Sequence, residues 1–179
     1  MGDYRQFLDD LAGTLSGRGF SITRNIGPGR YTVEILAAKG EPSTLKGNHA
    51  YFIVVTTMDL PSPESVTEFS QAAFGFSLAN SRAYLPMFPR GVTGRGIFTI
   101  VVPLVVSATF PDEMKDWISK EIRAKHNGPY NFPVLMASFS REIYYCKKTP
   151  FFMAFPWRSV RKFVEDTLNP SSTGQASAA

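Results

Sequence analysis

Two runs of consecutive apolar residues, Tyr51–Val55 and Ile97–Val102, constrain the fold of this chain most strongly. Neither run alternates between polar and apolar side chains, which is the pattern of strands that are buried on both faces. Such strands need other elements above and below them. We therefore expect both at the centre of a β-sheet that carries helices on its faces. Because proline has no backbone N–H, Pro103 predicts a bulge or a sheet edge at the end of the second strand.

The flanking sequence supplies the other elements. Apolar residues recur at i, i+3, i+4 and i+7 over residues 4–15, which predicts an amphipathic helix. Ser62 followed by Pro63 is typical of the start of a second helix. A third helix is expected over 112–125, and a fourth begins near Pro156 and buries Trp157 and further apolar residues. The remaining strands are expected at 20–23, 31–38, 132–139 and 142–147.

The order α-β-β-β-α-β-α-β-β-α indicates an α+β (mixed α/β) fold, with a mixed sheet of about six strands and helices packed on its faces. A length of 179 residues and a mass of 19.8 kDa suit one domain, which we place at residues 1–169. The hydrophobic fraction of 44% excludes disorder over most of the chain. Residues 170–179 are small and polar, so we expect a disordered tail there.

The single cysteine, Cys146, excludes an internal disulfide and a multi-cysteine zinc site. The amino-terminal residues lack the basic and apolar regions of a signal peptide. The longest apolar run, Ile97–Ser107, is about half the length needed to cross a bilayer. We therefore expect a soluble, cytoplasmic protein with no transmembrane segment.

Charge is distributed unevenly along the chain. The formal net charge is +4, with −1 on residues 1–89 and +5 on residues 90–179. Basic residues gather between positions 141 and 162, where a single acid, Glu142, lies among them. This excess could attract an acidic partner or the phosphates of nucleic acid, or it could be a solvated surface.

The segment from Thr149 to Arg158 combines five large apolar side chains with two prolines. Aromatic residues beside arginines are typical of protein interfaces, and they can also stack on bases or rest on lipid. The alternative is that they fill the core between the last strand and the last helix. The candidate interaction surface comprises Arg141, Lys147, Lys148, Phe151, Phe152, Trp157, Arg158, Arg161 and Lys162.

Catalytic patterns are weak. Cys146 has two candidate bases, His49 and His126, and both are expected in loops whose distance from Cys146 the sequence does not specify. The glycine-rich segment 91–96 leads into a strand, whereas a phosphate-binding loop leads into a helix. Glu34 and Asp59 remain as a weak alternative site, because Asp59 follows a central strand and carboxylates can hold a hard cation there.

Three functional hypotheses follow. The first is a non-catalytic binding or assembly module without a cofactor, which self-associates through the aromatic-rich surface as a homo-oligomer, with a two-fold dimer favoured. The second is a nucleic-acid-associated protein that uses the basic patch of residues 141–162. The third is a metal-assisted carboxylate enzyme with a site near Glu34 and Asp59.

Overall fold

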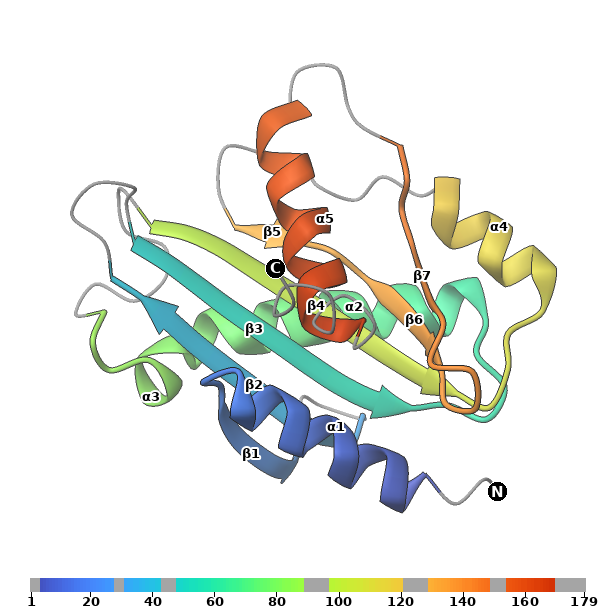
Figure 1. Ribbon diagram of the computed structural model, residues 1–179, viewed down its shortest axis with the longest axis horizontal. Helices are drawn as coiled ribbons and strands as arrows, with labels where there is room; N and C mark the ends of the chain where they lie inside the picture. Colours follow the sequence, from blue (N-terminus) through green and yellow to red (C-terminus); the bar gives the residue numbers. More distant parts are fainter. Residues whose placement is uncertain are drawn as a thin grey trace, which may run out of the picture.

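The chain forms one mixed β-sheet with helices on both faces (Figure 1). The computed structural model describes residues 4–27, 31–42, 48–88, 97–120, 129–148 and 154–169. The predicted fold class is thus confirmed. The predicted tail at 170–179 lies outside the described residues.

The strands run in the order β1-β2-β3-β4-β6-β7, and the short β5 also pairs with β4. The first three strands form an antiparallel meander, β3, β4 and β6 are parallel, and β7 returns antiparallel to β6. The two-residue β5 raises the strand number from the expected six to seven. The bounds are β1 Ser21–Ile26, β2 Val33–Glu41, β3 Asn48–Thr57, β4 Ile97–Ser107, β5 Tyr130–Asn131, β6 Val134–Ala137 and β7 Ile143–Tyr145.

Helices cover both faces of the sheet. The helices α1 (Arg5–Gly17) and α5 (Ala154–Leu168) pack on one face, and α2 (Pro63–Ala79) and α4 (Asp112–Lys120) pack on the other (Figure 1). The predicted start of α2 is confirmed, because the Ser62 hydroxyl accepts from the Ser65 backbone N–H at 3.2 Å. One extra turn of helix, α3 (Ser81–Tyr84), follows α2.

The two apolar runs are the central strands, as predicted, but the expectation for Pro103 is wrong. The strand β4 continues through Pro103 to Ser107. The Val101 carbonyl accepts from the Phe132 N–H at 2.9 Å, so the backbone N–H and C=O of Val101 point toward β5 and β6. Backbone direction alternates along a strand, so the backbone of Pro103, two residues later, points the same way. Pro103 therefore meets its neighbour at residues 132–133, where β5 has ended and β6 has not begun. A residue without an N–H is tolerated at this break in the ladder.

Gly40 in β2 permits close packing of the segment that follows α3. A Cβ atom at this position would lie 2.6 Å from the ring of Phe88 and 2.8 Å from the sulfur of Met87. Side chains do not approach a Cβ this closely, so glycine is required for Phe88 to reach its buried position.

Candidate functional site

Within the described ranges, the last strand, β7, lies at one edge of the sheet and pairs with no strand other than β6. The Ala137 N–H donates to the Glu142 carbonyl at 3.0 Å, so the backbone of Glu142 faces β6. Backbone direction alternates along a strand, so Tyr144 also faces β6 while Ile143 and Tyr145 face outward. Among the described residues, none hydrogen-bonds to the outward backbone groups of Ile143 and Tyr145.

The outward backbone groups of Lys147, two residues after Tyr145, do have hydrogen-bond partners. The Lys147 N–H donates to the Ser119 carbonyl at the end of α4 at 3.2 Å, and the Lys147 carbonyl accepts from the Arg161 guanidinium at 2.9 Å. The unpaired stretch of the edge therefore ends at Tyr145.

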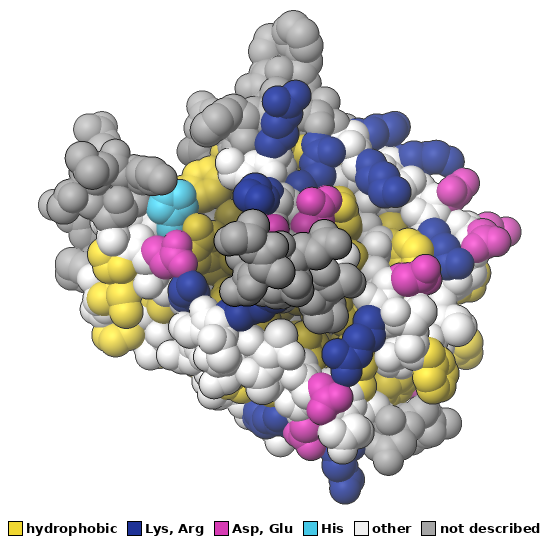
Figure 2. Space-filling view, in the orientation of Figure 1, with side chains coloured by type: hydrophobic (Ala, Val, Ile, Leu, Met, Phe, Trp, Pro, Cys, Tyr) yellow, Lys and Arg dark blue, Asp and Glu magenta, His cyan; other side chains and the backbone are white. Residues whose placement is uncertain are grey.

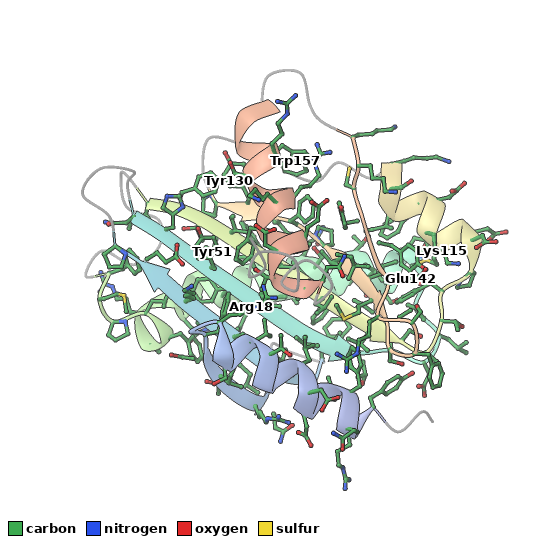
Figure 3. All side chains as sticks on the ribbon, in the orientation of Figure 1. Arg18, Tyr51, Lys115, Tyr130, Glu142 and Trp157 are labelled. Atoms are coloured by element: carbon green, nitrogen blue, oxygen red, sulfur yellow. The ribbon has the colours of Figure 1, made fainter. Side chains whose placement is uncertain are left out.

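An open groove of about 1000 Å³ runs along this unpaired edge. One wall comes from α4, where Lys115 stands opposite Glu142 (Figure 3), and the other wall comes from the end of α5. The floor is β7 itself. The lining residues are Lys115, Asp116, Ser119, Ser140, Arg141, Glu142, Ile143, Tyr144, Tyr145, Lys147, Glu165, Asp166 and Asn169.

Two consecutive tyrosines of β7 donate to carboxylates that line the groove, one beside β7 itself and one on α5. The Tyr144 hydroxyl donates to Glu142 at 2.6 Å, and the Tyr145 hydroxyl donates to Glu165 on α5. The bond from Tyr144 lowers the pKa of Glu142 below its usual value. Burial, followed by the bond to Glu165, raises the pKa of Tyr145 to about 12. Glu142 thus remains ionised and both phenols remain neutral at pH 7.

Lys147 lines the closed end of the groove, and further predicted basic residues follow it in the chain or lie on the adjoining part of α5. The Arg161 guanidinium contacts the Lys147 carbonyl, and the Trp157 indole donates to the Lys148 carbonyl at 2.8 Å. These bonds place residues 147–148 beside Arg158 and its neighbours on α5. Figure 2 shows basic side chains clustered over this part of the molecule. Lys162, in the next turn of α5, forms an ion pair with Asp166 at 3.3 Å.

Arg141 is separate from this group, at the turn between β6 and β7. Its guanidinium forms an ion pair with Asp10 on α1 at 3.0 Å and lies 5.8 Å from the centre of the Phe7 ring. Its backbone is left-handed, with φ of 59°.

The aromatic part of the predicted interaction surface needs correction. The side chain of Trp157 is 1% exposed and packs in the core between α5 and the sheet (Figure 3), so its assignment to a surface is wrong. It covers Phe132 at a ring-centre distance of 5.2 Å. Phe151 and Phe152 lie outside the described residues.

The structure brings the two residues of the weak alternative site into one depression. Glu34 and Asp59 line the same shallow depression of about 460 Å³ near the end of β3. Asp59 accepts from the Tyr4 hydroxyl at 3.2 Å. In the described part of the chain, no three His, Cys, Asp or Glu side chains lie close enough together to hold a metal ion.

The chain matches no protein-family model, and comparisons with curated proteins and with solved structures give no match. None of the helices within the described ranges is long and apolar enough to cross a bilayer.

Sequence reasoning found the basic residues of the site but missed the groove. The groove exists because β7 is an edge strand, and this depends on the spatial order of strands, which the pattern of residues 142–147 does not contain. The one available indication was the Tyr144-Tyr145 pair, since adjacent tyrosines on a strand must face opposite sides.

Proposed function

We propose that this protein is a non-catalytic binding module that receives an extended segment of a partner polypeptide as an added strand along β7. The supporting observation is the outward backbone of Ile143 and Tyr145, which has no hydrogen-bond partner in the part of the chain that the structure describes and faces an open groove between α4 and α5. Addition of a strand to an exposed sheet edge is a general mode of peptide recognition.

Backbone pairing alone would give weak binding. Two outward residues offer two N–H and two C=O groups, and each hydrogen bond contributes about 1 kcal/mol net. A total of about 4 kcal/mol corresponds to a millimolar dissociation constant. Useful affinity must therefore come from side chains of the partner that contact the walls of the groove. This is the arrangement expected of a module that selects its partners by sequence.

A second copy of this chain is a poor occupant of the edge. Antiparallel pairing of two β7 strands about a two-fold axis centred on Tyr144 would bring Lys147, just after β7 in one copy, toward Arg141 at the β6–β7 turn of the other. Like charges brought together in this way repel each other. The homodimer expected from the sequence stays a prediction that does not use this edge, and the cytoplasmic location stays a prediction as well.

Selection from a displayed library of random twelve-residue peptides tests the proposal. The wild-type protein should enrich peptides rich in strand-forming residues. Two variants should not enrich them: Ile143→Pro, which removes an outward N–H, and Ser119→Trp, which fills the groove from α4 without changing the strand. Failure of the wild-type protein to enrich any peptide, or equal enrichment by both variants, would contradict the proposal.

A second candidate function is nucleic-acid binding. It is favoured by the position of Lys147, Lys148 and Arg158, none of which has a carboxylate within ion-pair distance among the described residues. Phosphate contacts release counterions, so affinity for a DNA or RNA oligonucleotide should fall steeply with salt. Binding that changes little with salt would exclude this candidate.

A further inference from the structure

We infer that the polypeptide segment received along β7 carries acidic side chains at the end that lies beside Lys147, Lys148 and Arg158. This inference rests on the proposed function and specifies the chemistry of the partner. It is based on a difference in charge compensation between the walls of the groove and its closed end.

The acidic side chains of the groove walls already have partners. Asp116 pairs with Lys120, and Asp166 pairs with Lys162, each at 3.3 Å. The other two acids accept from tyrosines, since Glu142 is bonded to Tyr144 and Glu165 to Tyr145. These walls therefore offer little unsatisfied negative charge to an incoming basic residue.

At the closed end of the groove it is the basic side chains that lack partners of opposite charge among the described residues. Lys147, Lys148 and Arg158 are all exposed, and no described carboxylate lies within ion-pair distance of any of them. Nearby, the Arg161 guanidinium is directed at the Lys147 carbonyl and adds a further positive charge. Lys147, Lys148 and Arg158, without a described carboxylate partner, raise the local potential and favour an acidic ligand.

The path of the incoming chain brings it to these residues. A strand paired with Ile143 and Tyr145 cannot continue along the edge, because the Lys147 N–H is already bonded to Ser119. The added chain must leave the sheet at this point, among the basic side chains. In an antiparallel arrangement the acidic residues would fall in the amino-terminal half of the segment, and in a parallel arrangement in the carboxyl-terminal half.

The experiment starts from the peptides that the wild-type protein enriches. Synthetic copies are compared with copies in which each Asp is replaced by Asn and each Glu by Gln. Both sets are titrated against wild-type protein and against the triple variant Lys147→Gln, Lys148→Gln, Arg158→Gln. The control variant, Arg5→Gln, Arg24→Gln, Arg82→Gln, undergoes the same change of net charge at sites away from the groove.

The acidic peptides should bind wild-type protein and the control variant at least about tenfold more tightly than their amide copies. This difference should vanish in the triple variant and at salt near 0.5 M, where exposed charges are screened. Equal binding of acidic and amide peptides would overturn the inference and leave the proposed function standing. No enrichment of any peptide, with binding of an oligonucleotide instead, would overturn both.

Discussion

The backbone N–H of Lys147 donates to the carbonyl of Ser119 at 3.2 Å, which joins the end of α4 to the end of β7. This bond limits the unpaired edge to Ile143 and Tyr145 and separates it from the basic residues that follow. The short length of the unpaired edge also limits aggregation, because long unpaired edges pair with other chains. Hydrogen bonding thus ends the edge at Lys147, while Ile143 and Tyr145 remain accessible to a partner strand.

The alternation of backbone direction along β7 predicts different effects of proline at adjacent positions. Tyr144→Pro should lower the free energy of unfolding by about 3 kcal/mol, since its N–H faces β6 and proline cannot supply that bond. Ile143→Pro should cost much less, because its N–H faces the groove. Urea denaturation of both variants measures the difference. Equal losses would mean that the outward assignment of Ile143 is wrong.

A methyl group at Gly40 should destabilise the fold. The added Cβ of Gly40→Ala would lie 2.6 Å from the Phe88 ring, and relief of such overpacking costs about 1–3 kcal/mol. Gly13→Ala is the matched control, because no atom within 4 Å meets its Cβ. That residue is inside α1, so the change should stabilise the protein by about 0.5–1 kcal/mol. Thermal or urea unfolding should show opposite signs, and the same sign for both would contradict this packing.

The hydroxyl of Tyr145 should titrate late, and its contribution to stability should be lost only at alkaline pH. Its pKa is raised to about 12 from 10.0, so the folded state holds this proton more tightly than the unfolded state. The resulting stabilisation is complete below pH 10 and is lost as the pH rises toward 12. Tyr145→Phe should remove one late step from the tyrosinate absorbance titration. Its stability deficit relative to wild type should shrink above pH 10. A titration unchanged by the substitution would contradict the environment described for Tyr145.

Truncation of Trp157 should affect stability more than any exposed substitution in α5. Trp157→Ala removes a fully buried aromatic side chain, which costs about 3–5 kcal/mol, and it also leaves the Lys148 carbonyl without the indole N–H. Arg158→Ala, at the next position and exposed, should change the free energy of unfolding by less than about 0.5 kcal/mol. Equal effects of the two changes in urea denaturation would place Trp157 outside the core.

The central part of the fold could be predicted because a strand buried on both faces is apolar at consecutive positions, and this pattern is visible in the sequence. The apolar runs 51–55 and 97–102 have one simple structural solution, and the Ser62-Pro63 start of α2 reflects local hydrogen bonding. The path of β4 through Pro103 was not predictable, since its tolerance depends on a break in a neighbouring strand that lies about 30 residues further along the chain.

The candidate site could be predicted only in part, and for a related reason. Charge is visible in sequence, so residues 141–162 are predicted to be basic, although Arg141 lies apart from the others in the fold. Whether an aromatic residue is exposed depends on which helix face meets the sheet, and Trp157 belongs to the buried stripe of α5. The open edge of β7 depends on strand order, which local patterns do not specify.

The break opposite Pro103 also divides the sheet into a part joined by many ladder hydrogen bonds and a part joined by few. The strands β3 and β4 pair without interruption from Asn48 to Thr57, whereas β6 pairs with β4 only over Leu104–Ser107. Subglobal opening is easiest where the fewest ladder bonds must be broken, so the β6–β7 hairpin should exchange its amide hydrogens faster than the β2–β4 centre. The proposed docking strand would thus be added to the least cohesive part of the sheet. A ligand bound there would slow hydrogen exchange throughout the hairpin. Occupancy of the groove would thereby stabilise the carboxyl-terminal third of the fold against local unfolding.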